Sequence, residues 1–305
     1  MILMTLFLIL LLKGIQPVFS QEKVIKCPQE DMLLVLRNQI TANTPDSLKL
    51  KYNFRFMELL KECLMSPDVI SYSFDSLKFL SVLTHEKHHV RLITWQLEMS
   101  GPEYCYFGLF SYQSGSKTVV VSLSDTTLHR KPDEKAVYDK KDWYGAVYYD
   151  LNVTRRMNST VVTLLGRRNL TGRISRKIIE FASINDEGDL LFGSRNMLVM
   201  NHPKEIARLI FDYPSEIPLT LKFEDTRYVK GKPKKQKLIV FHRLTRQDYF
   251  DHYDMPVPDY EFYDGFIFQD GHWQFIQDID LRTRSSGLPE RKRREKNTDL
   301  FGPLK

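Results

Sequence analysis

A histidine-rich stretch, "VLTHEKHHVRLITW" (residues 82–95), holds the side chains whose types and spacing most directly suggest chemistry. His85, Glu86 and His89 match the pattern H-E-x-x-H, in which two histidines bind zinc and the glutamate activates a zinc-bound water. That pattern requires a helix, because residues four apart then share one face. Here His89 runs directly into the alternating residues 90–95, which are typical of a strand. We therefore interpret the motif as a polar turn. A zinc peptidase using these residues is the weakest functional alternative, and weak metal binding by the three histidines is another.

The acidic and aromatic segment "DYFDHYDMPVPDYEFYDGF" (residues 248–266) is a second candidate site. Exposed tyrosines can stack against sugars, and clustered carboxylates can catalyse hydrolysis or bind calcium. Pro256 and Pro258 predict an irregular loop in the middle of the segment. The candidate ligand-binding residues are Tyr249, Tyr253, Asp259, Tyr260 and Asp264. A hydrolase that uses carboxylates within residues 248–280 is the alternative interpretation.

Two further carboxylates lie near the end of that range. Asp278 and Asp280 alternate with Ile279, which predicts that both lie on one face of a terminal strand. The chain contains no G-x-S-x-G motif, no glycine-rich phosphate loop and no C-x-x-C pair. We therefore assign no catalytic residue, no metal site and no cofactor from the sequence.

The excess of basic residues lies at the two ends of the chain. Residues 282–305 carry eight basic and three acidic side chains, and together with Lys13 they account for the whole formal charge of +6. The neutral body argues against a nucleic-acid partner. We expect residues 283–305 to form a disordered, solvated basic tail, with attachment to an anionic envelope surface as the alternative.

The amino-terminal residues predict export. Residues 1–12 are apolar without a break, Lys13 and Pro17 then interrupt the run, and Val18 and Ser20 suit the −3 and −1 positions of a cleavage site. We expect a signal peptide over residues 1–20 and a mature protein in the periplasm or cell envelope. The apolar run is too short to cross a bilayer, so no stable membrane span is expected after cleavage.

Three cysteines follow the predicted cleavage site. In an oxidising compartment they allow one disulfide and leave one free thiol. Cys27 and Cys63 both lie in the amino-terminal helical region and are the favoured pair. Cys105 lies between two tyrosines in a strand pattern, where a small buried side chain is expected.

The hydrophobic pattern predicts an α+β protein that is mainly β. Helical spacing covers residues 28–66, and short strands separated by turns then follow, the main ones being 90–98, 104–112, 117–124, 143–151, 159–167, 176–184, 237–244, 263–269 and 272–279. Connections too short for crossover helices favour an antiparallel, meander-rich arrangement, as a sandwich or a partly closed barrel; a small propeller is the weaker alternative. We expect a helical region over residues 21–70 and a β domain over residues 71–282.

Several phrases of the β region have a familiar order: "SFDSLKFLSVLT" (73–84), "RLITWQLEMSG" (91–101), "DWYGAVYYDL" (142–151), "RKIIEFASIND" (176–186) and "YEFYDGFIFQDGHWQFIQDIDLR" (260–282). The series resembles an uncharacterised family of exported Bacteroidetes proteins, from about residue 66 to residue 282. The resemblance implies an envelope location and carries no established activity. This chain departs from the family pattern at residues 167–169, where relatives show a turn like Trp-Asp-Gly-Asn, and at His242, where relatives carry an aspartate.

We therefore expect an exported, envelope-associated protein of unknown function. Its predicted role is to bind or assemble with an envelope component, either a protein or a glycan.

Overall fold

The computed structural model describes residues 27–42, 44–66, 69, 71–126, 130, 133–156, 159–170, 173–200, 205–226, 235–246, 254–281, 298–299 and 302–303. The predicted signal peptide, residues 1–20, lies outside the described residues. Tyr249 and Tyr253 also lie outside them, as does most of the basic tail. Within that tail, β16 (Thr298–Asp299) and β17 (Gly302–Pro303) pair as a two-stranded sheet.

Among the described residues, two α-helices precede the β domain, as the hydrophobic spacing predicts. They are α2 (Glu30–Thr41) and α3 (Asp46–Leu64). Glu30 and Asp31 in the first turn of α2, and Asp46 in that of α3, place negative charge at the positive end of each helix dipole. Leu33, Leu36 and Ile40 form the buried stripe of α2 at spacings of three and four residues. Each helix therefore has a buried face that can pack on a sheet.

The described strands form three larger sheets. Sheet A is β1 (Ser81–His85), β2 (Val90–Glu98), β3 (Tyr104–Ser114) and β4 (Lys117–Asp125), with the short 3-10 helix η2 (Glu86–His88) between β1 and β2. Sheet B is β5 (Tyr138–Asp139), β9 (Leu190–Phe192), β8 (Ile174–Asn185), β7 (Ser159–Asn169) and β6 (Val147–Arg156), with β11 (Leu209–Pro214) paired to β8. Sheet C is β10 (Leu198–Val199), β15 (His272–Ile276), β14 (Val257–Gln269), β13 (Gln236–Thr245) and β12 (Leu221–Thr226).

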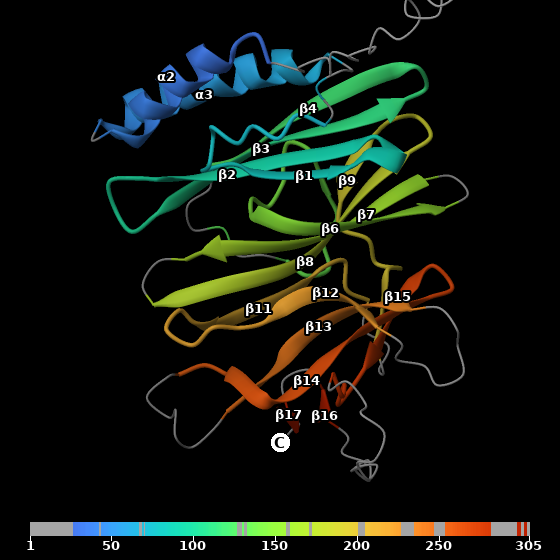
Figure 1. Ribbon diagram of the computed structural model, residues 1–305. Coiled ribbons are helices and arrows are strands. Elements are labelled where there is room, and N and C mark those ends of the chain that lie inside the picture. Colours follow the sequence, from blue (N-terminus) through green and yellow to red (C-terminus); the bar gives the residue numbers. More distant parts are fainter. Residues whose placement is uncertain are drawn as a thin grey trace, which may run out of the picture.

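The helices and the three sheets are stacked as four layers, in the order helices, sheet A, sheet B, sheet C (Figure 1). Because side chains alternate along a strand, a sheet inside the stack sends apolar side chains to both neighbours. In β2, Trp95 packs toward the helices and Leu92 toward sheet B. In β8, Ile178 packs toward sheet A and Ile179 toward sheet C. In β2, the six consecutive residues from Val90 to Trp95 are therefore all buried, polar ones included.

The fold class predicted from the sequence is confirmed: helices come first, mainly antiparallel strands follow, and the protein is mainly β. The sheets stack as in a sandwich, and none of them closes into a barrel. One described pair, β10 with β15, is parallel and departs from the antiparallel expectation.

The predicted strand over residues 143–151 begins later than expected, at Val147. The preceding backbone bonds to side chains instead of a neighbouring strand. The Gly145 N–H donates to Asp125 Oδ2 at 2.9 Å, and its carbonyl oxygen accepts a bond from Arg168 at 2.7 Å. A Cβ at this glycine would meet Tyr106 Cβ at 2.4 Å, so the close approach requires glycine.

The irregular loop predicted over the middle of residues 248–266 is wrong from Val257 onward, because β14 begins there. Pro258 pairs with Leu244 of β13. The described pairing of β14 with β15 starts only at Gly265, so this part of β14 has a neighbouring strand on one side. A missing N–H is tolerated at such a position, which explains how the proline fits in the strand.

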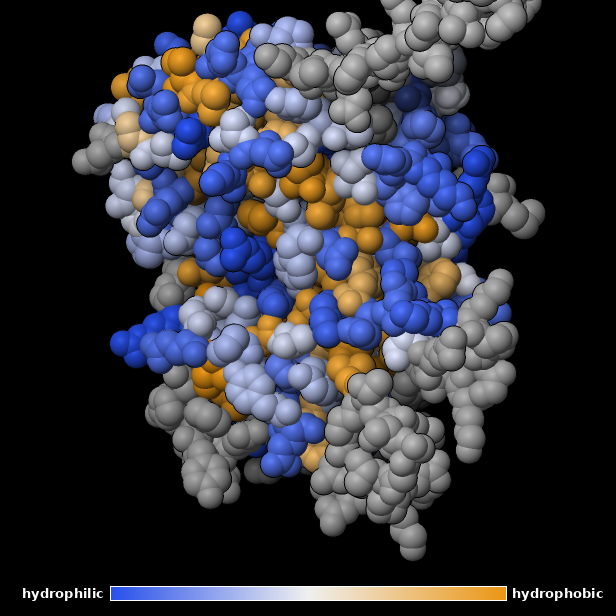
Figure 2. All heavy atoms as spheres, viewed as in Figure 1, coloured by the Kyte–Doolittle hydropathy of each residue, from blue (hydrophilic) through white to orange (hydrophobic). Residues whose placement is uncertain are grey.

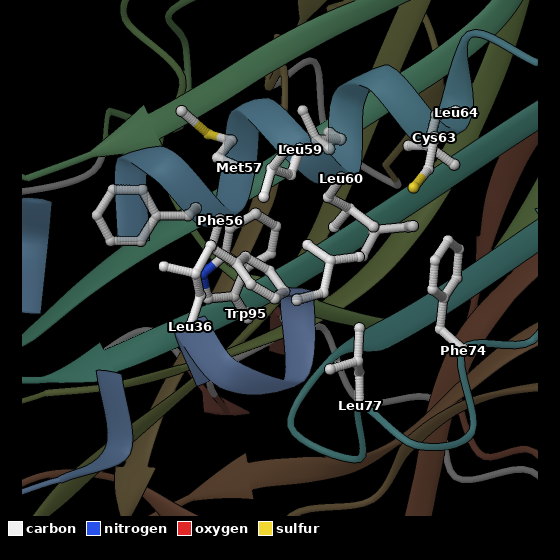
Figure 3. Packing of buried hydrophobic residues seen from close by; sticks show 14 of the residues in the cluster. Leu36, Phe56, Met57, Leu59, Leu60, Cys63, Leu64, Phe74, Leu77 and Trp95 are labelled. Carbon is white, nitrogen blue, oxygen red and sulfur yellow. The ribbon is translucent and has the colours of Figure 1, made fainter. Parts of the chain in front are cut away.

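A disulfide joins Cys27, just before α2, to Cys63 near the end of α3. The helices pack on sheet A through a cluster that includes Phe56 and Trp95, whose rings meet edge to face with centroids 5.6 Å apart (Figure 3). Trp95 Nε1 donates to Asn53 Oδ1 at 2.7 Å, so the buried indole N–H has a partner. Cys105 is a free, buried thiol in the same cluster, and burial raises its pKa.

The outer surface of the helical layer carries apolar side chains among polar ones (Figure 2). Met32 and Val35 on α2 are 54% and 52% exposed. In the part of the chain that the structure describes, no helix is long and apolar enough to cross a membrane.

Candidate functional site

A wide bulge in β14 brings together most of the described candidate residues. His242 of β13 pairs with Tyr263, but the next residue, Arg243, pairs with Asp259. Tyr260, Glu261 and Phe262 are therefore extra residues on β14 with no partner position on β13. Bulges of this kind redirect side chains and are frequent beside functional sites.

The bulge presents one rigid aromatic ring to solvent. Tyr260 is 52% exposed, and its hydroxyl donates to the carbonyl oxygen of Pro218 at 3.0 Å. The ring stands edge-on to His242, with centroids 4.8 Å apart. Glu261 beside it is exposed, and the carboxylate of Asp259 accepts a bond from the Glu261 backbone N–H at 3.0 Å. The surface thus combines a fixed aromatic ring with carboxylates at its edge.

His242 supports the bulge from beneath and has a defined tautomer. Its Nδ1 accepts the backbone N–H of Thr220 at 3.1 Å, so that nitrogen carries no hydrogen. Nε2 therefore carries the hydrogen and donates to the Tyr263 hydroxyl at 3.0 Å. Burial lowers the pKa of His242 and Lys177 lowers it further, whereas Asp259 opposes the shift.

The segment of residues 218–221, which connects sheet B to sheet C, is held by side chains from both sheets. Lys177 of β8 donates to the carbonyl oxygen of Leu219 at 2.5 Å, and Tyr149 of β6 donates to that of Leu221 at 2.9 Å. The His242 N–H donates to the Thr220 carbonyl oxygen at 3.2 Å. Together with Tyr260, these groups bond every carbonyl of the segment, which makes it a rigid support for the bulge.

Asp264, another predicted ligand-binding residue, lies in a different environment. Its side chain is fully buried and forms a two-pronged ion pair with Arg243, at 2.8 and 2.6 Å. The same guanidinium reaches Asp278 at 2.6 Å, and the Asp278 N–H donates to Asp264 at 3.0 Å. A bidentate arginine is a structural partner for a carboxylate. Asp264 therefore anchors the bulge and is not presented to a ligand.

The predicted strand face that carries Asp278 and Asp280 is wrong. β15 ends at Ile276, and Asp278 has a φ of 55° in the turn that follows. Ile279 turns back onto sheet C, where its N–H donates to the Tyr263 carbonyl oxygen at 2.7 Å. The chain reverses because Ile279 is buried in the apolar cluster on the outer face of sheet C. Asp264 and Asp278 are thus both ion-paired with Arg243, whereas Asp259 and Glu261 form no such pair with any described residue.

The H-E-x-x-H stretch lies in a turn, as the sequence analysis favours. His85 ends β1, η2 spans Glu86–His88, and His89 adopts a left-handed backbone with φ 49° and ψ 42°. His85 and His89 therefore do not share the face of an α-helix, and the zincin arrangement does not form. Among the described residues, no group of three His, Cys, Asp or Glu side chains is placed to hold a metal.

Residue type alone indicates Tyr260 and Asp259 as candidates but does not indicate the groups that support them. His242 differs from the aspartate of the resembling family, and Lys177 and Arg243 carry no local signal of their roles. Their roles depend on partners at least 21 positions away in the sequence, such as Tyr263 and Asp264. A polar residue in an otherwise apolar strand was the available hint, because a buried polar group needs a partner.

The chain matches no protein-family model, no curated protein and no solved structure.

Proposed function

We propose that this protein is an exported, envelope-associated binding module that recognises an envelope component through the bulge of β14. The exported location is supported by the apolar leader of residues 1–12 and by the disulfide between Cys27 and Cys63, which suits an oxidising compartment. The resemblance to exported Bacteroidetes proteins supports the envelope location. The ligand is a protein or a glycan of that envelope, and the surface favours a glycan.

The single observation that carries the binding role is the half-exposed ring of Tyr260, held by its own hydroxyl bond to Pro218. A ring that is already ordered loses little side-chain entropy when a ligand stacks on it. Tyrosine rings bury apolar area against the C–H faces of sugars, while neighbouring carboxylates accept hydrogen bonds from sugar hydroxyls. Glu261 and Asp259 are positioned for the second task.

The experiment is a glycan array and titration with purified envelope polysaccharide, comparing the parent chain with three variants. We expect Tyr260→Ala to weaken binding by tenfold or more, which corresponds to about 1.4 kcal/mol. Tyr260→Phe keeps the ring but loses the hydroxyl bond to Pro218, so it should lose less affinity than Tyr260→Ala and more than none. Glu261→Gln should cause a smaller loss. Equal binding by the parent and Tyr260→Ala would reject the bulge as the binding surface.

Export has its own test. The full chain expressed in a bacterial host should be found in the periplasmic or envelope fraction, with a new amino terminus at Gln21. Recovery of the uncleaved chain from the cytoplasm would contradict the proposed location.

A further inference from the structure

The turn between β1 and β2 brings two histidines together that the H-E-x-x-H pattern does not pair. A 3-10 helix has three residues per turn, so side chains three positions apart lie above one another. His85 immediately precedes η2 and His88 ends it. Their Nδ1 atoms lie 3.1 Å apart, and their ring centroids are 4.6 Å apart. The paired residues are thus His85 and His88, not His85 and His89.

The strand pairing around the turn keeps this geometry in place. His85 pairs with Val90 across the antiparallel ladder, and the His89 N–H bonds back to the Glu86 carbonyl oxygen at 3.0 Å. Val90 is fully buried, so the carboxyl-terminal end of the turn is anchored in the core. His85 and His88 are themselves only half-buried, which leaves their edges open to solvent. The pair is therefore both ordered and accessible.

The separation of the two nitrogens suits a shared metal ion. Imidazole nitrogen binds divalent transition metals at about 2.0–2.1 Å. Two such bonds at angles between square-planar and tetrahedral place the nitrogens about 2.9–3.4 Å apart. The observed 3.1 Å falls in that interval. In the metal-free protein at neutral charge, one Nδ1 carries a hydrogen and donates it to the other. When a metal binds, that hydrogen moves to Nε2 of the same ring, so both Nδ1 lone pairs become available and no net proton is released.

The surroundings select the class of metal. Lys87 and Arg155 lie close enough to His88 to repel a cation, so only a strong imidazole ligand interaction can outweigh their charges. Hard cations such as calcium and magnesium require several oxygen ligands and gain little from imidazole. Copper(II) has the highest affinity for nitrogen ligands among the divalent first-row ions.

We propose that His85 and His88 form a two-nitrogen site for a divalent transition metal, best satisfied by copper(II), with water in the remaining coordination positions. The site lies on a different sheet from the β14 bulge and does not depend on the proposed binding function. Its ligand pair is the one that the 3-10 turn creates.

The test is calorimetric titration of the purified, untagged chain with copper(II), zinc(II) and magnesium, together with electron paramagnetic resonance of the copper complex. We expect copper to bind more tightly than zinc, and magnesium not to bind at this site. His85→Ala and His88→Ala should each remove one copper equivalent per chain or weaken it by tenfold or more. His89→Ala is the matched control and should leave that equivalent unchanged.

The spectrum of the parent complex should contain the hyperfine pattern of two nitrogens, reduced in each single variant. Circular dichroism of every variant checks that the sheet is intact, since all three positions lie at the turn. Retention of the copper equivalent in His88→Ala, or an equal loss in His89→Ala, would overturn the assignment.

Discussion

Glu180 and Arg208 form an ion pair, with Arg208 Nε 2.8 Å from Glu180 Oε2, and neither side chain is accessible to solvent. Three of the other four guanidinium hydrogens are bonded to the carbonyl oxygens of Asp133 at 2.6 Å, Ala136 at 2.9 Å and Phe192 at 3.3 Å. The Tyr138 ring lies against the guanidinium at 4.5 Å. A buried charge is tolerated only when it is paired and hydrogen-bonded in this way.

Breaking this pair should strongly destabilise the protein. Glu180→Gln removes the compensating charge and leaves Arg208 charged in the interior, which costs about 3–5 kcal/mol. Urea unfolding followed by tryptophan fluorescence measures the loss. The matched control is Glu216→Gln in the exposed pair with Arg173, 3.7 Å apart, where about 1 kcal/mol or less is expected. A similar effect of the two substitutions would contradict the role of the buried pair.

His242 should make the stability of the protein sensitive to acid. Its folded-state pKa lies below the usual value, so the unfolded chain binds the proton more readily. The contribution of the neutral imidazole is therefore complete above about pH 6.5 and is lost as the pH falls from there through the folded-state pKa. Protonation also places a hydrogen on Nδ1, which then faces the Thr220 N–H.

The measurement is the free energy of unfolding of the parent and His242→Asn between pH 5 and pH 8. Asparagine offers an oxygen acceptor near the position of Nδ1 but does not titrate. We expect the free energy of unfolding of the parent, relative to that of His242→Asn, to decrease as the pH falls below about 6.5. The decrease should be about 1 kcal/mol, because a hydrogen bond is lost. Parallel curves for the two proteins would show that His242 is not the titrating group.

The Cys27–Cys63 disulfide should contribute substantially to stability. It closes a sequence separation of 36 residues, for which loop-closure entropy predicts about 3–4 kcal/mol. The Cys27→Ser/Cys63→Ser double variant should unfold at a correspondingly lower urea concentration, and reducing agent should lower the stability of the parent but not of that variant. Thiol titration should find one free thiol, from Cys105, only after denaturation. Two or more additional reactive thiols in the oxidised parent would contradict the pairing.

Gly265 should not tolerate a side chain. A Cβ there would lie 2.0 Å from the carbonyl oxygen of Ile239 and 2.7 Å from Cδ1 of Ile279. Gly265→Ala therefore forces the backbone of two paired strands apart and should cost about 1–3 kcal/mol. Gly101→Ala is the matched control, because nothing lies within 4 Å of its added Cβ. Thermal unfolding compares the two, and equal melting temperatures would contradict the close approach.

The fold class could be predicted from local patterns, because the spacing of apolar residues differs between helices and strands. Alternation marked β2 to its observed bounds, residues 90–98, and helical spacing marked α2 and α3. The prediction was wrong where backbone groups bond to distant side chains, as at Gly145, and where a proline fits a strand that is paired on one side, as at Pro258. Neither circumstance is visible within a short window of sequence.

Only part of the candidate site could be predicted from residue types. Tyr260 and Asp259 stood out by residue type, but the sequence grouped them with Asp264, whose side chain is buried against Arg243. Whether a carboxylate is presented or ion-paired depends on a register shift between two strands, and that shift is decided by how both strands pack.

By itself, the sequence determined the helical and strand segments, the apolar leader and the predominance of β structure, since period and composition act over neighbouring residues. Only the tertiary structure decided the stacking order of the three sheets, the support of Tyr260 by residues 218–221, and the pairing of His85 with His88. Each of these features depends on contacts between separate elements, or between the two ends of a turn. Such contacts form only after the chain has closed the loop between them.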